Sequence, residues 1–284
     1  MKMNENDKVY PTENYRKMVV IFLDILGTRN NQRFEDKFTI HRVFHTEAKI
    51  NESRKHEHVI YDRKVYSFSD CAYFIYYYKD GIEEKRKDDM QLLRVAMTNT
   101  SISLLTIYNE GYLVRGGITL GEGYFDELGL FGPAIERAYE LEDKEADVPI
   151  VLLDKELGKR YLDWERGQKN INDSLFSRPV CTVEEDGDKV FMNSFFQLEF
   201  GAPKLLTENV ELDIDVIKEK LRHVIENDKK KYEKPSEEQD KKSKKKKSTI
   251  LEKLVWFEKY YLSKSNRLLP QYKNGAVGVI VKND

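Results

Sequence analysis

The chain has 284 residues, enough for one large domain or for a domain with a smaller appendage. Hydrophobic residues make up 40% of the chain and charged residues 35%, as in a rather polar globular protein. The formal net charge of −2 points to no particular partner, neither nucleic acid nor an anionic membrane.

The chain begins with a polar segment, residues 1–16, which is unlike a signal peptide. Residues 18–26 follow as an apolar run that only Asp24 interrupts, and Gly27 closes it. A continuous apolar run with β-branched residues predicts a buried central strand. Residues 33–54 carry apolar side chains at loosely helical spacing, which predicts a helix.

Two strands and a helix are predicted next. Residues 59–81 are dense in valine, isoleucine, tyrosine and phenylalanine and break at Ser69-Asp70, which indicates two strands joined by a tight turn. Residues 88–109 repeat apolar side chains at helical spacing, so we expect an amphipathic helix that ends at Gly111.

The following segments alternate between strand and helix. Residues 112–125 predict a strand punctuated by glycines, and residues 132–146 predict a helix with Pro133 near its start. Residues 148–154 predict another strand, and residues 182–200 predict a hairpin.

The remainder of the chain is more polar. Residues 227–248 hold almost nothing apolar and include a run of lysines, so we expect a solvated or disordered linker there. A last helix is expected in residues 249–264, and residues 275–281 could add an edge strand. We therefore expect five parts: a polar N-terminal segment (1–16), a main domain (17–205), a helix (206–226), a charged linker (227–248), and a C-terminal helix and strand (249–284).

The first six predicted elements occur in the order strand, helix, strand, strand, helix, strand. This order is the β-α-β-β-α-β split motif of a ferredoxin-like fold. We therefore expect an α+β architecture, with an antiparallel sheet, helices packed on one face, and further helices and strands towards the C-terminus.

The two cysteines and the lack of a long apolar run bear on the compartment. Cys71 and Cys181 are too few for a disulfide framework or for a metal site by themselves, so a reducing, cytoplasmic location is expected. No apolar run approaches the roughly 20 residues that span a bilayer, so no membrane partner is expected.

Two carboxylates are expected at one edge of the sheet. Asp24 lies at the end of the first strand, and Asp70 lies in the turn between the second and third strands. The first and third strands run side by side in this fold, so the two side chains converge. Converging carboxylates repel each other unless a cation neutralises them, and oxygen ligands suit Mg²⁺ or Mn²⁺. Gly27 would let backbone N–H groups approach a phosphate chain, so the pattern indicates metal-assisted chemistry on a nucleoside triphosphate.

Each of these residues also has an ordinary structural explanation. An aspartate that ends a strand is usually a helix cap or a turn residue, and Ser69-Asp70 is a common turn sequence. It is the joint placement of Asp24 and Asp70 on one fold that favours a functional site.

Four segments, "FLDILG", "YSFSD", "VRGGITLG" and "GPAIERAYELE", resemble the landmark motifs of the class III nucleotidyl cyclases. All four occur in the family's order and near its spacing, which makes the combination specific. The resemblance covers residues 18–155, about half of the chain, and makes residues 17–205 the expected cyclase catalytic domain.

The resemblance implies a homodimer with active sites at the interface. It places two divalent cations, Mn²⁺ or Mg²⁺, on Asp24, the backbone carbonyl of Ile25 and Asp70. The implied reaction is attack of the ribose 3′-hydroxyl on the α-phosphorus, with release of diphosphate.

The position four residues before Asp70 bears on the base that the site would accept. Purine cyclases carry a purine-selecting lysine there, whereas this chain has Tyr66. A tyrosine is similar to the pyrimidine cyclases of bacterial Pycsar anti-phage systems, which make cyclic CMP or cyclic UMP and activate a toxic effector. A bulky ring leaves less room for a purine, and its hydroxyl can hydrogen-bond a pyrimidine edge. The resemblance places Phe22, Gly27 and Thr28 with Tyr66 in the substrate-binding part.

The last motif departs from the family at two positions. Where the family carries an asparagine and, four residues later, a transition-state arginine, this chain has Glu136 and Glu140. An acid cannot supply the positive charge of an arginine. Arg115 and Arg137 are the candidates for the cationic role, with Arg115 taken as the catalytic residue. The alternative for Arg115 is a structural ion pair inside the fold.

Three functions follow from these patterns. The first is a pyrimidine nucleotide cyclase that converts UTP or CTP into cyclic UMP or cyclic CMP, as the second-messenger synthase of an antiviral system with a separate effector. The residues do not choose between the two substrates, and the resemblance favours UTP. The second is a cyclase-like module that has lost catalysis and only binds a nucleotide or a partner. The third is a polymerase-type palm acting on nucleic acid, which the near-neutral charge disfavours.

Overall fold

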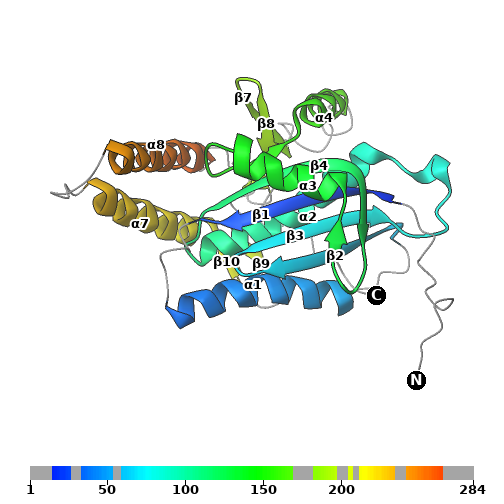
Figure 1. The fold of residues 1–284 in the computed structure, drawn as a ribbon, viewed down its shortest axis with the longest axis horizontal. Coiled ribbons are helices and arrows are strands. Elements are labelled where there is room, and N and C mark those ends of the chain that lie inside the picture. The colour runs from blue at the N-terminus through cyan, green and yellow to red at the C-terminus, as the bar shows by residue number, and fades with distance from the viewer. Residues whose placement is uncertain are drawn as a thin grey trace, which may run out of the picture.

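The computed structural model describes residues 15–26, 33–53, 59–168, 182–196, 204–206, 211–233 and 241–264. Within these residues the chain is an α+β protein with an eight-stranded mixed sheet, a separate two-stranded sheet and six α-helices (Figure 1). None of the described helices combines the length and the apolar character needed to cross a bilayer. The strand expected in residues 275–281 lies outside the described residues.

The first half of the chain forms the predicted elements in the predicted order. Asp88 caps the second long helix by accepting hydrogen bonds from the backbone N–H groups of Met90 and Gln91. Gly111, with a φ of +82°, follows the end of that helix. The bounds are β1 (Arg16–Ile25), α1 (Phe34–Ser53), β2 (Tyr61–Phe68), β3 (Cys71–Tyr78), a short 3₁₀-helix (Glu84–Arg86), α2 (Asp89–Asn109) and β4 (Val114–Phe125).

The second half contains the predicted hairpin of residues 182–200 as β7 and β8, and one helix that was not predicted. This helix, α4, is capped by Asp154, and it buries Leu157 and Tyr161, four residues apart. The bounds are β5 (Leu130–Phe131), α3 (Pro133–Glu140), a π-helical turn (Leu141–Glu145), β6 (Val151–Leu153), α4 (Lys155–Gly167), β7 (Val183–Asp186), β8 (Lys189–Met192), β9 (Lys204–Leu206), β10 (Glu211–Asp213), α7 (Ile214–Glu233) and α8 (Lys241–Lys264).

The strands of the main sheet lie in the order β2-β3-β1-β4-β6-β8-β7, with β5 paired to β4. The first four of these strands are antiparallel to one another. However, β6 pairs parallel with β4, so the expectation of an antiparallel sheet is wrong for the sheet as a whole. The cause is the helical crossover through α3, which returns the chain to the end of the sheet from which β4 starts.

Helices cover both faces of the sheet, and the expectation that they cover one face is wrong (Figure 1). Successive residues of β1 point to opposite faces. One face packs against α1 and α2 through Val19, Ile21 and Leu23. The other face packs against α3 through Met18, Val20 and Phe22. An unbroken apolar run is typical of a strand buried on both faces, so the signal was present in the sequence.

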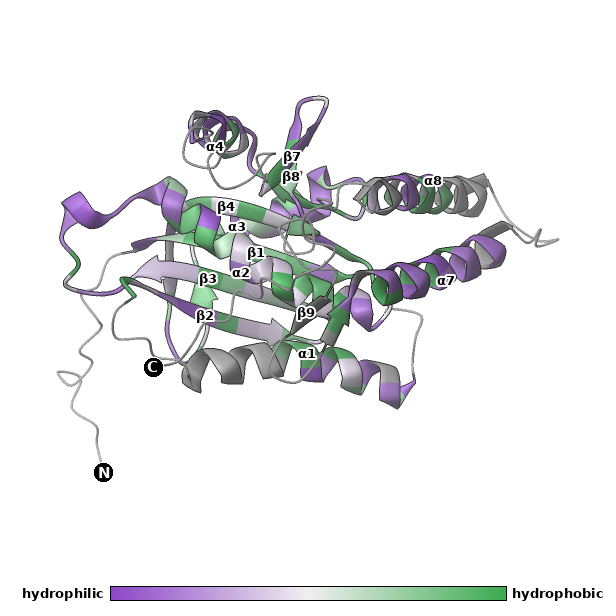
Figure 2. Ribbon diagram, turned by 180° about the vertical axis from the view of Figure 1, so that it is seen from behind, coloured by the Kyte–Doolittle hydropathy of each residue, from purple (hydrophilic) through white to green (hydrophobic). Residues whose placement is uncertain are grey.

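Residues 227–248 were expected to be solvated or disordered, and both ends of this segment are helical, with residues 227–230 exposed or only partly buried. Helix α7 continues to Glu233 and α8 begins at Lys241, while residues 234–240 lie outside the described residues. Lysine and glutamate are good helix formers, so a helix that is anchored on one face propagates into a polar sequence. Figure 2 shows hydrophilic and hydrophobic residues mixed along α7, whose buried residues include Ile217, Leu221 and Ile225.

The two C-terminal helices pack against the body of the protein. The helix expected in residues 206–226 is α7, which starts only at Ile214 because β9 and β10 pair in a small sheet before it. Helix α8 buries Leu254, Phe257 and Tyr261 in the core that contains α2. In Figure 1 both helices lie at the end of the sheet where β1 ends.

Candidate functional site

Asp24 and Asp70 lie at the same edge of the sheet, as predicted. Asp24 is the next-to-last residue of β1, where it pairs with Cys71 of β3 and with Arg115 of β4. The backbone N–H of Ile25 donates to the carbonyl of Asp70 at 3.0 Å. The main chain therefore holds the two aspartates at neighbouring positions, whatever their side chains do.

The turn that carries Asp70 consists of two residues, Ser69 and Asp70, between β2 and β3. Ser69 has a φ of +57°, in the left-handed region that tight hairpin turns use. The thiol of Cys71 donates to the carbonyl of Phe68 at 3.1 Å, across this turn. Backbone geometry therefore determines where Asp70 lies.

The Cys71 thiol shows how much negative charge gathers at this edge. Burial raises the pKa of Cys71 to about 11, and the charges of Asp24, Asp70 and Glu142 raise it in the same direction. Glu142 belongs to the π-helical turn after α3, so a third carboxylate approaches from a different element. Carboxylates gathered around one half-buried group favour a bound cation, which would neutralise their repulsion.

Arg115 and Glu142 form an ion pair beside Asp24. The guanidinium of Arg115 contacts Oε1 of Glu142 through Nε, at 2.5 Å, and through Nη2, and its Nη1 donates to the carbonyl of Ala146 at 3.4 Å. The two side chains are only 20% and 5% exposed. The structural ion pair that was the alternative for Arg115 is therefore present.

Arg137 is also engaged with carboxylates of its own chain. Its Nη1 lies 2.6 Å from Glu145 and its Nε lies 2.8 Å from Asp154, and the bond to Glu145 is the main cause that raises the pKa of Arg137. Glu140, at the position of the family's arginine, forms an ion pair with Lys144 at 2.7 Å. Arg137 thus ties α3 to the start of α4.

Tyr66 lies on β2 opposite Tyr73 of β3. Strand register puts Tyr66, Tyr73 and Asp24 on the same face of the sheet, the face that α3 covers. The hydroxyl of Tyr66 donates to the carbonyl of Asp126 at 2.5 Å. Burial, followed by the charge of Asp126, raises the pKa of Tyr66, so the hydroxyl keeps its proton at neutral pH.

Phe22, which was predicted to bind substrate, is only 4% exposed. Its ring packs against the rings of Tyr73 and Tyr139, with centroids 4.6 and 5.6 Å away. Phe22 therefore supports the site from the core, because alternate residues of β1 face α3. Gly27 and Thr28, the other two predicted substrate-binding residues on this segment, lie outside the described residues.

The donor atoms at this edge suit a hard divalent cation. Asp24 and Asp70 offer carboxylate oxygens and Ile25 offers a backbone carbonyl, at adjoining ends of β1 and the β2–β3 turn. Mg²⁺ and Mn²⁺ prefer oxygen ligands and commonly use one or two carboxylates plus substrate phosphates. Across the described part of the chain, no group of three or more His, Cys, Asp or Glu side chains is arranged to hold a metal. The fit therefore depends on the two carboxylates and the carbonyl.

Sequence reasoning missed two residues near the site, Glu142 and Lys253. Glu142 lies inside the last motif segment, but only the fold brings it to Arg115, which is 27 positions away in the chain. Lys253 lies on α8, outside every motif. Burial lowers the pKa of Lys253, and the charge of Arg115 lowers it further. Charges that meet through the fold leave no local pattern in the sequence.

Comparisons with known proteins add no family to this description. No model of a protein family matches the chain, and a search of curated proteins finds no match.

Proposed function

We propose that this chain is a pyrimidine nucleotide cyclase, which converts UTP or CTP into the 3′,5′-cyclic monophosphate and diphosphate. The observation that carries the proposal is the placement of Asp24 and Asp70 at the adjoining ends of β1 and the β2–β3 turn. The β-α-β-β-α-β connection of β1 to β4 and the strand order β2-β3-β1-β4 support a ferredoxin-like, cyclase-type core around them.

The biological role belongs to the same proposal. Tyr66, the "FSD" turn and the "RGGI" strand resemble the pyrimidine cyclases of anti-phage systems. These residues do not choose between UTP and CTP, and UTP is favoured because it is the commoner substrate in the family that the chain resembles. The cyclic product would act in the cytoplasm as a second messenger for a separate effector. Neither a membrane nor nucleic acid is needed for this chemistry.

Asp24, Asp70 and the carbonyl of Ile25 would hold two divalent cations, Mn²⁺ or Mg²⁺. When bound, such ions polarise the α-phosphate and lower the pKa of the ribose 3′-hydroxyl. By fixing the positions of those ions, the carboxylates would orient the nucleotide so that the 3′-oxygen approaches the α-phosphorus in line with the leaving group. The new bond joins the 3′-oxygen to phosphorus, the bond from phosphorus to the bridging oxygen breaks, the hydroxyl proton passes to water, and diphosphate leaves.

A homodimer would complete the site. Both arginine candidates, Arg115 and Arg137, contact carboxylates of their own chain. Two exposed apolar side chains flank the site: Phe68, 82% exposed beside the turn of Asp70, and Tyr139, 47% exposed on α3. Exposed apolar surface next to a site that needs further charge supports a second subunit packing there.

The direct test is a panel of the four nucleoside triphosphates with Mn²⁺. The purified protein is expected to form a cyclic product and diphosphate from UTP or CTP, and little from ATP or GTP. Chromatography identifies the cyclic nucleotide, and a coupled assay measures diphosphate. Removal of the metal with EDTA should stop the reaction, and added Mn²⁺ should restore it. A folded dimer that makes no cyclic product from any of the four would contradict the proposal.

Replacing Tyr66 with phenylalanine is expected to lower kcat/KM for the pyrimidine substrate about tenfold, the value of one hydrogen bond to the base. The hydroxyl oxygen can still accept from a base N–H while its hydrogen is donated to Asp126. Steady-state cyclisation rates measure the effect. The matched control is Tyr139→Phe, which removes a hydroxyl from α3, the helix that covers the same face of the sheet. Equal activity of the two variants and the unmodified protein would show that Tyr66 does not contact the base.

A second candidate is a cyclase-like module that binds a nucleotide without turning it over. Glu136 and Glu140 favour this alternative, because they replace the neutral and cationic side chains of the family. Calorimetry separates the two functions. Tight binding of a nucleoside triphosphate without diphosphate release supports the module, whereas Mn²⁺-dependent release of diphosphate excludes it.

A further inference from the structure

Arg115 lies directly opposite Asp24 in the sheet, since the two residues pair across β4 and β1. Residues opposite each other on neighbouring strands point their side chains to the same face. Here it is the face to which Phe22 also points and which α3 covers. Opposite charges placed in this way can form an ion pair across the strands, and such a pair would compete with a metal for the carboxylate of Asp24.

The guanidinium of Arg115 is instead directed to the π-helical turn after α3. Its Nε and Nη2 contact Oε1 of Glu142, and its Nη1 donates to the carbonyl of Ala146. The side chain of Glu142 is only 5% exposed, so water screens this contact little. Breaking a buried ion pair leaves an uncompensated charge, which favours the pair as it stands.

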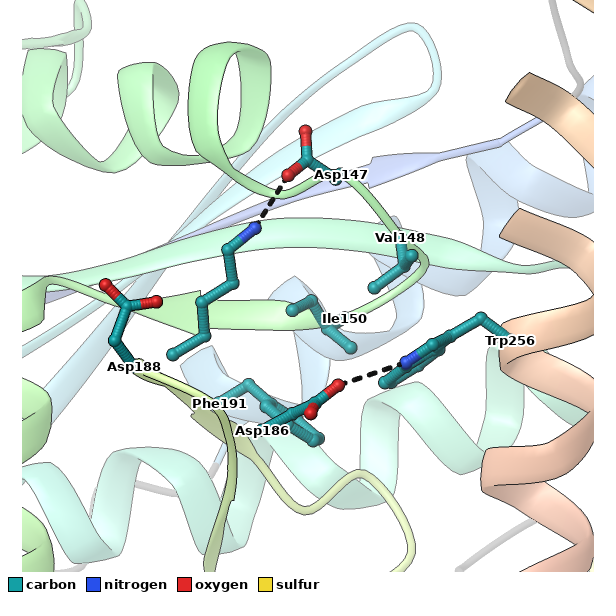
Figure 3. Close-up of a pocket in the computed structure, with 8 residues that line it drawn as sticks. Asp147, Val148, Ile150, Asp186, Asp188, Phe191 and Trp256 are labelled. Carbon is teal, nitrogen blue, oxygen red and sulfur yellow. Dashed lines mark hydrogen bonds and ion pairs between the residues drawn. The ribbon is translucent and has the colours of Figure 1, made fainter. Parts of the chain in front are cut away.

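The turn that carries Glu142 is anchored by further contacts. The guanidinium of Arg137 lies 2.6 Å from Glu145 at the end of the turn. The ammonium of Lys189 donates to the carbonyl of Glu145 at 2.9 Å and to Asp147 at 2.7 Å, beside a pocket of about 320 Å³ (Figure 3). The backbone around Glu142 is therefore fixed, and its carboxylate stays where it meets the guanidinium.

We propose that Glu142 is a positioning residue, which holds the guanidinium of Arg115 away from Asp24 and so leaves the Asp24 carboxylate to a divalent cation. This inference rests on the proposed function, and it concerns the binding of the metal. Glu142 acts through Arg115. Without the charge of Glu142, Asp24 becomes the better partner for the guanidinium, because a charged acceptor binds it more strongly than a neutral one.

The test is a double-mutant cycle on Mn²⁺ binding without nucleotide, measured from the electron paramagnetic resonance signal of free Mn²⁺. Glu142→Gln is expected to raise the dissociation constant about tenfold, because Arg115 then competes for Asp24. Arg115→Gln should bind Mn²⁺ at least as tightly as the unmodified protein. Adding Glu142→Gln to Arg115→Gln should change the dissociation constant by less than about twofold.

The matched control is Glu140→Gln, which removes another carboxylate from the same end of α3, one paired with Lys144. This variant should bind Mn²⁺ as the unmodified protein does. Thermal unfolding checks that each variant folds. If Arg115→Gln does not fold, because it leaves Glu142 as a buried unpaired charge, the double variant is compared with Glu142→Gln alone. It should then recover the affinity of the unmodified protein.

The inference is overturned if Glu142→Gln leaves Mn²⁺ binding unchanged, or if it weakens binding equally with and without Arg115, since Glu142 would then act on the cation directly. A folded protein that binds no Mn²⁺ overturns it too. Coupling between Glu142 and Arg115 in a protein that cyclises no nucleotide upholds the positioning role and contradicts the cyclase proposal. Cyclisation without that coupling does the reverse.

Discussion

Asp70→Ala is expected to lower kcat/KM for cyclisation about a thousandfold or more. A metal ion contributes several kcal/mol to the stabilisation of a phosphoryl transition state, and each 1.36 kcal/mol is a factor of about ten in rate. The fold should survive, because Ser69 sets the turn and the bond from Ile25 N–H to the carbonyl of Asp70 uses only main-chain atoms. Cyclic nucleotide formation and the free energy of unfolding in urea are measured side by side.

The matched control for this variant is Asp143→Ala. Asp143 is an exposed acid on the π-helical turn, next to Glu142 in sequence, and so close to the site without being a proposed metal ligand. It should keep full activity. If Asp70→Ala retained more than about a tenth of the activity while binding Mn²⁺ as the unmodified protein does, Asp70 would not be a metal ligand.

Gly117→Ala is expected to lower the free energy of unfolding by about 3 kcal/mol, the upper end of the usual cost of overpacking. Gly117 lies on β4, where a Cβ would sit 2.2 Å from the carbonyl oxygen of Ala138 and 2.6 Å from Cβ of Leu141. Those atoms belong to α3 and to the turn after it, so they can yield only if the helix moves away from the sheet. Urea denaturation followed by circular dichroism measures the loss.

Gly129→Ala is the control for this substitution. A Cβ at Gly129 would meet no atom within 4 Å, and its backbone is not left-handed, so its stability should change little. Gly117→Ala should also reduce activity in the fraction that folds, because displacing α3 displaces Glu142 and its partner Arg115. Equal stability of the two variants would mean that α3 does not pack closely on β4.

The elements that were predicted correctly are those whose pattern is local. A single strand or helix pattern accounts for each of them: the apolar run of β1, the aromatic strands on either side of Ser69-Asp70, and the amphipathic repeat of α2. The side of the sheet on which each helix packs depends on distant segments, so the one-faced arrangement was wrong. Helix α4 was missed although Asp154 and the Leu157–Tyr161 spacing indicated it.

In the candidate site, too, some features were predicted correctly and others depend on contacts between distant segments. Asp24 and Asp70 were brought together correctly because strand order follows from the order of elements. A structural ion pair was the stated alternative for Arg115, but the partners of Arg115 and Arg137 were not predictable, since each partner comes from another element and many acids could have filled that place. The position of Lys253 was not predicted, because no packing surface was predicted for its helix, expected in residues 249–264.

The backbone bond between Ile25 and Asp70 has a consequence for how such a site can change over evolutionary time. The spacing of the two acids is set by the ladder of main-chain bonds and by a two-residue turn, so substitutions in the surrounding side chains leave it intact. Residues such as Tyr66, one strand further out, can then be exchanged without moving the two aspartates. In the proposed cyclase, base preference could therefore change independently of the metal ligands.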